Sequence, residues 1–178
     1  MTTPSRRAQR ALSLLEKGGE EVSLVEMGIE DSDIPPIADF LRTDVRVKEL
    51  HLHMNEIGDE GAMALAEVLR TNTSLTRLEL GANFIGDAGM GELGRALAGN
   101  TSLEYLGMSE SRITDAGLRA FAEGIAGNTT LKALALGGNK GITDASVGVL
   151  EALLRDSSIN DLNTFHTSMS QENREVLR

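Results

Sequence analysis

The side chains best suited to metal or acid–base chemistry in this 178-residue chain are its three histidines, His51, His53 and His166. His51 and His53 alternate along a short segment with an apolar residue between them, so both side chains should leave the same face of a strand. Glu49 and Glu79 fall nearby in the repeat pattern, and two imidazoles with a carboxylate are ligand types that zinc or copper accepts. Solvated histidines between acidic neighbours explain the same pattern, and we favour that interpretation. The sequence therefore predicts no metal and no cofactor.

Catalysis has little support in the sequence. The chain contains no Cys, which excludes thiol catalysis and Cys-based zinc sites. No Ser falls in a motif with a base and an orienting group. The segment 89–94 reads G-x-G-x-x-G, but its glycines fall inside a predicted helix and not in the strand-to-helix turn that dinucleotide binding requires. We expect no catalytic residue, no small-molecule substrate and no enzymatic activity.

The charge of the chain argues against nucleic acid as a partner. The formal net charge is -10, and aromatic residues make up only 3% of the chain. Phosphate backbones need clustered Lys and Arg, and single strands need aromatic stacking platforms. The first residues, MTTPSRRAQR, precede no apolar run, and no stretch is long and apolar enough to cross a bilayer. We expect a soluble cytoplasmic protein, monomeric, that binds neither membrane nor nucleic acid.

The chain repeats itself every 28 residues. Apolar triplets start at Leu50, Leu78, Leu106 and Leu134, and Val22 fits one step earlier. Other apolar columns keep the same period, and one extra residue near Lys140–Gly141 shifts the fifth unit. The predicted units are 19–46, 47–74, 75–102, 103–130 and 131–158, and a sixth begins at Ile159 and then departs from the pattern.

Each unit predicts a short strand followed by a helix. Alternation at Leu50-His51-Leu52-His53 indicates a strand with one buried face, and four-residue spacing from Ala62 to Leu69 indicates a helix. The predicted fold class is therefore α/β, a right-handed βα solenoid with parallel strands on the concave face and helices on the convex face. We expect one domain over 1–178, with an N-terminal capping helix within 1–18 and a C-terminal cap over 159–178 that includes a helix from Ser170.

Three polar columns have structural explanations. Aspartates start each helix and can cap its free N–H groups. Glycines two residues later allow close packing. Asparagines end the helices, because Asn tolerates the left-handed backbone conformation. The aspartates supply half of the net charge, so the acidity says less about a partner than its size suggests. The columns are Asp31, Asp59, Asp87, Asp115 and Asp144; Gly61, Gly89 and Gly117; and Asn72, Asn100 and Asn128.

The unit Leu-x-x-Leu-x-Leu-x-x-Asn-x-Ile-Gly-Asp-x-Gly resembles the leucine-rich repeat of the ribonuclease-inhibitor subfamily over residues 19–158. A capping helix, five units and a short final helix together also resemble the C-terminal domain of tropomodulins, which cap actin filament pointed ends. The first resemblance implies a curved solenoid, and the second implies actin as an alternative partner. Leucine-rich-repeat regulators and inhibitors of enzymes or GTPases form a third class.

The predicted binding surface lies where the repeat leaves the sequence free. In the outward columns Arg77 stands between Glu49 and Tyr105. Arg77 and Glu49 form a self-neutralising ion pair, or Arg77 and Tyr105 anchor a partner protein. The second alternative is open because Arg and Tyr are enriched among binding hot spots. Gly107, Ala135 and their neighbours leave the second half of this face nearly bare, so a partner approaches closely there or uses the convex side or an edge. We expect a non-enzymatic scaffold that binds a protein through Glu49, His51, His53, Met54, Arg77, Glu79 and Tyr105.

Overall fold

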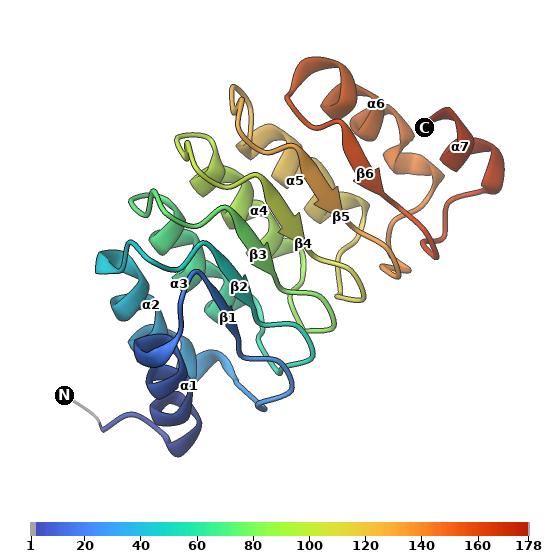
Figure 1. Cartoon of the computed structure of the whole chain (residues 1–178). Helices are drawn as coiled ribbons and strands as arrows, with labels where there is room; N and C mark the ends of the chain where they lie inside the picture. Colours follow the sequence, from blue (N-terminus) through green and yellow to red (C-terminus); the bar gives the residue numbers. More distant parts are fainter. Residues whose placement is uncertain (1–2, 178) are drawn as a thin grey trace.

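The computed structural model describes residues 3–177 and alternates short strands with helices along its whole length (Figure 1). The strands have three residues each, and every helix after the first follows a strand. The elements are α1 Arg6–Lys17, β1 Glu21–Ser23, the 3-10 helix η1 Asp31–Asp33, α2 Ile34–Thr43, β2 Glu49–His51, α3 Asp59–Leu69, β3 Arg77–Glu79, α4 Asp87–Leu97, β4 Tyr105–Gly107, α5 Asp115–Gly124, β5 Ala133–Ala135, the 3-10 helix η2 Asp144–Ser146, α6 Val147–Asp156, β6 Asp161–Asn163 and α7 Gln171–Val176.

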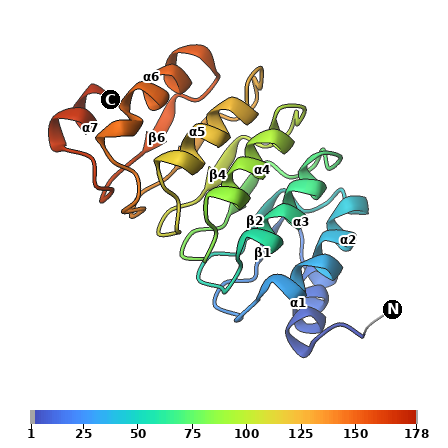
Figure 2. The ribbon, with the colours of Figure 1, turned by 180° about the vertical axis from the view of Figure 1, so that it is seen from behind.

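The strands form one parallel sheet in the order β1-β2-β3-β4-β5-β6. Paired residues are 28 apart, so Glu49 aligns with Arg77 and Arg77 with Tyr105. Strands and helices occupy opposite sides of the molecule, as the front and back views show (Figures 1 and 2). The predicted α/β repeat solenoid is confirmed. Within residues 3–177 no helix is both long enough and apolar enough to cross a membrane.

The core is one continuous layer between the sheet and the helices. Leu50, Leu78, Leu106 and Leu134 are at most 1% exposed, because each points away from the outward face of its strand. The two ends differ from the middle. Helix α1 covers the first repeat with Ala11 and Leu15, while Leu162 of β6 is only partly buried.

Helices were predicted at both ends of the chain, and both are present. Helix α1 begins after Ser5, whose hydroxyl accepts a hydrogen bond from the Ala8 N–H. Helix α7 begins after Ser170, whose hydroxyl accepts from the Asn173 N–H. Residues 1–2 and 178, which the predicted caps include, lie outside the described residues. The division into two caps and five repeats stays a prediction.

The aspartate column connects successive repeats. Asp31 Oδ1 accepts hydrogen bonds from the N–H groups of Gly58 and Gly61, at 2.6 and 2.9 Å, and these groups lie at the start of α3 in the next repeat. Asp115 likewise accepts from the Thr143 N–H at 2.8 Å. The carboxylates therefore cap the helix that follows their own repeat, which the sequence period alone does not distinguish from capping their own.

The explanation given for the asparagine column is wrong. Asn72 does not have a left-handed backbone; its side chain is buried and hydrogen-bonded. Its Oδ1 accepts from the Ser74 and Leu75 N–H groups, and its Nδ2 donates to the Leu41 carbonyl of the preceding repeat at 2.7 Å. Asn100 and Asn128 make equivalent bonds. Asn suits these positions because its side-chain amide both accepts and donates hydrogen bonds, and so satisfies backbone groups of two repeats at once.

Candidate protein-binding surface

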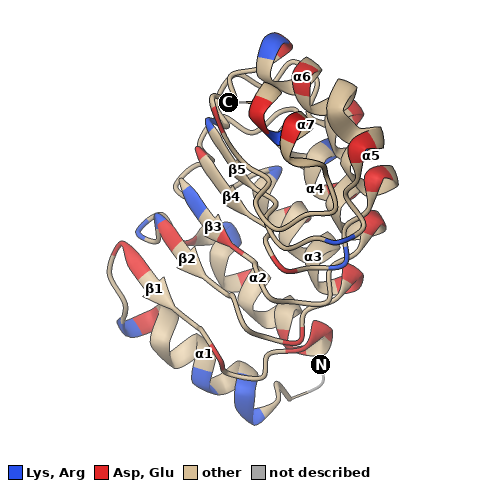
Figure 3. Cartoon of the chain, turned by 90° about the vertical axis from the view of Figure 1, so that its right-hand side faces the viewer, with Lys and Arg blue, Asp and Glu red and all other residues tan. Residues whose placement is uncertain are grey.

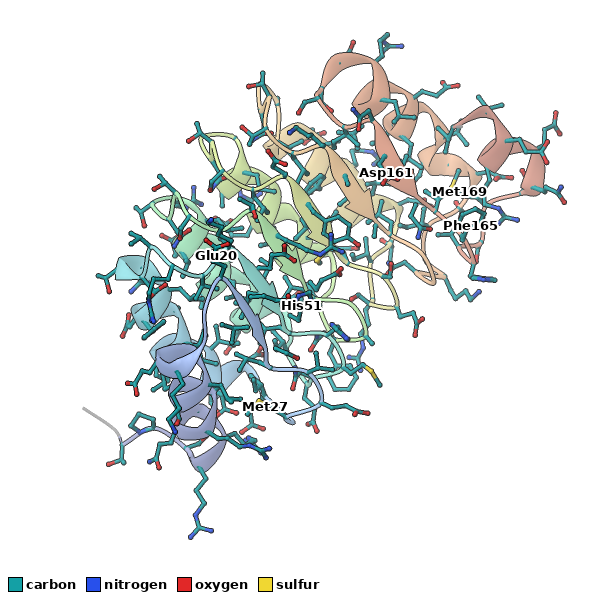
Figure 4. The ribbon with its side chains drawn as sticks, viewed as in Figure 1. Glu20, Met27, His51, Asp161, Phe165 and Met169 are labelled. Carbon is teal, nitrogen blue, oxygen red and sulfur yellow. The ribbon has the colours of Figure 1, made fainter. Side chains whose placement is uncertain are left out.

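The structure brings the predicted binding residues together over β2, β3 and β4. Strand alternation directs their side chains outward, while the leucines between them enter the core. His53 and Met54 follow in the loop after β2. Figure 4 shows His51 on this exposed side of the sheet. The outward residues of the strands are Glu49, His51, Arg77, Glu79 and Tyr105.

Arg77 is the centre of a stacked cluster. Its guanidinium carbon lies 3.5 Å from the centroid of the Tyr105 ring, and its Nη2 donates to Glu79 Oε1 at 2.6 Å. Of the two alternatives for Arg77, the ion pair with Glu49 does not form among the described residues, although the two residues are aligned in the sheet. The guanidinium turns toward the ring, whose negative face attracts it, and finds its carboxylate two residues along its own strand.

The Tyr105 phenol is held in its neutral form by this environment. Partial burial and the negative charge of Glu79 raise the pKa of Tyr105 above its usual 10.0, while Arg77 works in the opposite direction. The ring is thus restrained on one face by Arg77 and remains partly open on the other side. A restrained, half-exposed aromatic side chain loses little conformational entropy on binding.

Glu79 also fills space that the sequence suggested was empty. A Cβ atom at Gly107 would overlap the Glu79 carboxylate, so this glycine makes room for the acidic side chain of the neighbouring strand. The expectation of a bare surface is wrong at Gly107. Beyond it, Tyr105 and Ala133 line a small hollow of about 120 Å³.

The histidines lie among carboxylates. His51 Nε2 is 3.3 Å from Glu21 Oε1 and 3.9 Å from Glu49 Oε2, but it forms no hydrogen bond of good geometry within residues 3–177. The His53 ring packs edge-on against His51, with centroids 6.1 Å apart. Across the described part of the chain, no three His, Asp or Glu side chains are grouped so that they could hold a metal ion.

Met54 belongs to a column of residues with a left-handed backbone, which the sequence did not predict. Its backbone φ is 60°, and the residues 28 positions before and after it, Glu26 and Ala82, are also left-handed. Glu110, Gly138 and His166 continue the series. These residues turn the chain at the carboxyl end of each strand, so their side chains point outward. Only one of them is glycine, so residue type gave no signal.

The turns after the strands border two adjoining hollows. The first has a volume of about 520 Å³ and is lined by residues that include His53, Met54 and Glu79. The second has a volume of about 440 Å³ and is lined by residues that include Phe165 and His166. Ser109 and Glu110 belong to both linings. The sequence indicated that small residues leave this half of the face open to a partner, but it did not indicate Glu110 or Phe165.

A basic face lies apart from this surface, on the first helix. Arg6, Arg10 and Lys17 of α1 are exposed and lie within about 40° of arc at 100° per residue. Figure 3 shows Lys and Arg along α1 at one end of the molecule. The repeat columns predicted no basic stripe, because this face belongs to the cap. Three cations are few compared with the phosphate contacts that nucleic-acid binding uses.

Parallel strands, each followed by a helix at a fixed period, define an α/β solenoid. The sequence agrees with this class: a family model described as Leucine Rich repeat matches residues 47–66, 71–94, 99–122 and 127–150, which together make up more than half of the chain. The chain therefore belongs to the leucine-rich repeat family. Its placement in the ribonuclease-inhibitor subfamily stays a prediction.

Solved structures with a similar fold include a domain named as an actin-binding site and a tropomodulin domain. Leiomodin-1 Actin-Binding Site 2 has a TM-score of 0.69 at 22% identity and covers 86% of this chain and 88% of its own. The tropomodulin C-terminal domain of Caenorhabditis elegans has a TM-score of 0.66 at 19% identity, with coverage of 84% and 92%. An internalin from Listeria monocytogenes has a TM-score of 0.51 at 23% identity, with coverage of 81% and 35%. No curated protein matches the sequence. These likenesses show the fold alone.

Proposed function

We propose that this protein is a non-enzymatic scaffold that binds a protein partner through the outer side of its sheet. The observation that carries the proposal is the stack of Arg77 on Tyr105, held in place by the ion pair with Glu79. Arg and Tyr are the residue types that most often dominate binding energy at protein interfaces. Their side chains are already ordered before a partner arrives, so binding costs less entropy.

The shape of the surface favours a macromolecule over a small ligand. The hollows are open and lie along a row of turns, and none of the polar side chains among the described residues that line them is buried, unlike the convergent polar groups of a cofactor site. The predicted surface extends across three strands and one turn, from Glu49 to Tyr105. Such a broad, partly polar surface that includes an Arg and a Tyr is typical of protein interfaces.

The test compares affinity purification of partners by three forms of the chain. The double variant Arg77→Ala, Tyr105→Ala should lose the partners that the wild type recovers, as identified by mass spectrometry. The control is Arg119→Ala, Glu123→Ala on the outer side of α5, which removes exposed side chains from the helix side of the same repeat as Tyr105. Equal recovery of partners by wild type and the Arg77, Tyr105 variant would refute this site.

Actin is the second candidate partner. The similarity that supports it is to a domain named as an actin-binding site, and it covers 86% of this chain and 88% of that domain. An intracellular location is part of this proposal. The chain should then slow pointed-end elongation of filaments whose barbed ends are blocked, or sediment with filaments. Unchanged elongation and no co-sedimentation at micromolar protein would remove actin and leave the scaffold proposal intact.

A further inference from the structure

The two hollows beside the strand ends form one track. The turns after the strands run along one edge of the sheet, and Phe165 lies at its far end in the turn after β6 (Figures 1 and 4). Met54 lines the first hollow and Phe165 the second, and Ser109 with Glu110 stands between them. Four strand spacings separate the turns of Met54 and Phe165, which is about 19 Å at 4.8 Å per strand.

The backbone of this track is already paired. The N–H groups of Met54 and Ala82 donate to the carbonyls of Gly81 and Ser109, at 3.0 and 2.8 Å. The N–H of Glu110 donates to the next repeat in the same way, at 2.7 Å. A partner strand thus finds no free ladder of backbone donors along the track. Recognition here must come from side chains.

An exposed large apolar side chain stands at each end of the track, and a carboxylate stands in its middle. Met54 is 49% exposed and Phe165 is 53% exposed, whereas most large apolar side chains of the described chain are buried. Glu110 is exposed, and its carboxylate has no hydrogen-bond or ion-pair partner within residues 3–177. Its side chain rests on Gly138, where a Cβ atom would come within 2.6 Å of the Glu110 Cγ. The carboxylate is therefore held at the boundary between the hollows.

The other charged side chains near the track have partners in the structure. Glu79 is paired with Arg77 at 2.6 Å, and the Lys140 ammonium, which keeps its positive charge, donates to the His166 carbonyl at 2.6 Å. Glu110 is thus the carboxylate of the track that is left to a ligand. A ligand that complements Met54, Glu110 and Phe165 has a cation between two apolar groups.

We propose that the track binds an extended segment of a partner protein, with one Arg or Lys for Glu110 and a large apolar side chain for each hollow. At about 3.3 Å per residue, the 19 Å track corresponds to about six residues. The proposal rests on the proposed function in that the ligand is a protein. It places the specificity at Glu110 and Phe165, outside the surface centred on Arg77.

A random dodecapeptide library displayed on phage tests the proposal, with the full chain as target. Selection on wild type should enrich peptides with a basic residue between two large apolar residues. For the best peptide, fluorescence polarisation should show that Glu110→Gln and Phe165→Ala each weaken binding about five- to tenfold. Circular dichroism and thermal unfolding establish that both variants remain folded.

Matched controls separate the track from its surroundings. Glu123→Gln removes the same charge from α5 of the same repeat, and Phe84→Ala removes a ring that is 48% exposed but lines neither hollow. Both should leave the affinity unchanged. Enrichment of no peptide, or of peptides that bind the Glu110 and Phe165 variants as well as wild type, would overturn the track. Peptides that lose binding only with Arg77→Ala, Tyr105→Ala would also overturn it, but would support the proposed function.

Discussion

Asp59 and Gly89 fit together across the boundary between two repeats. The Gly89 N–H donates to Asp59 Oδ1 at 2.9 Å, and a Cβ atom at position 89 would lie 2.8 Å from that same oxygen. The aspartate of one repeat thus requires the glycine of the next. The same pairing recurs between Asp31 and Gly61, so the two columns form one device that links successive helices.

This relationship predicts that Gly89→Ala lowers the free energy of unfolding by about 1 to 3 kcal/mol, because the methyl group would overpack the boundary between α3 and α4. The control is Gly148→Ala in α6, where an added Cβ meets nothing within 4 Å. That substitution should stabilise the chain by about 0.5 to 1 kcal/mol, since alanine favours helix over glycine. Urea unfolding measures both. A Gly89→Ala variant as stable as wild type would contradict the steric argument.

The repeat period predicts the Asp and Gly columns, but it does not predict which helix each aspartate caps. Columns of Asp and Gly at helix starts are visible in the sequence, and so are the strands and buried leucines. A period of 28 residues aligns Asp59 with Asp87 but does not say which helix its carboxylate reaches. That choice depends on the distance between adjacent repeats, which sequence spacing does not contain.

A column of buried asparagines predicts a stabilising substitution. Asn55 Nδ2 donates to the carbonyls of Leu24 and Leu52, at 2.9 and 2.8 Å, while its Oδ1 accepts two backbone N–H groups. Asn83 and Asn139 make similar bonds. The fourth repeat has Ser111 at this position, and its hydroxyl is buried without a hydrogen-bond partner among the described residues.

We expect Ser111→Asn to raise the free energy of unfolding by about 1 to 2 kcal/mol, because the longer amide can reach backbone groups of both repeats. Thermal unfolding monitored by circular dichroism measures the change. The reverse substitution, Asn83→Ser, should destabilise the chain and serves as the matched test. If Ser111→Asn lowered the melting temperature, the fourth repeat would lack room for the amide.

The aspartate column also predicts an acid-sensitive contact between repeats. Burial raises the pKa of Asp115, but hydrogen bonds from Ser146 and Thr143 outweigh it and bring the pKa below the usual 3.8. Because the folded-state pKa is the lower one, the carboxylate contributes its full stabilisation above about pH 4 and loses it as the pH falls through the folded-state pKa.

Asp115→Asn should therefore cost about 1 to 3 kcal/mol at neutral pH, and the difference from wild type should shrink as the pH falls below 4. Urea unfolding at several pH values between neutrality and about pH 2.5 measures this difference. Asp39→Asn, at an exposed position on α2, removes the same charge and should cost far less. A cost for Asp115→Asn that stayed constant down to the lowest pH would rule out a role for the ionised carboxylate.

The binding surface was predictable in part. The outward columns placed Glu49, Arg77 and Tyr105 side by side, because parallel strands in register repeat at a fixed interval. The partner of Arg77 was not predictable, since the choice between Glu49 and Glu79 depends on a side-chain rotamer. The track was missed because its turn positions carry unrelated residue types, from Glu26 to His166, and share only a backbone conformation.

The single tyrosine offers a direct test of the Arg77 cluster. The chain has one Tyr and no Trp, so tyrosinate absorbance reports on Tyr105 alone. The phenol should titrate with a pKa above 10.0, because burial and the Glu79 carboxylate disfavour its ionised form. Glu79→Gln removes that negative charge and should lower the pKa of Tyr105. The control Glu104→Gln changes a carboxylate that is paired with Lys132 at 2.8 Å, and should leave the pKa of Tyr105 nearly unchanged. Equal shifts in both variants, or a wild-type pKa at or below 10.0, would show that Glu79 does not face the phenol in solution.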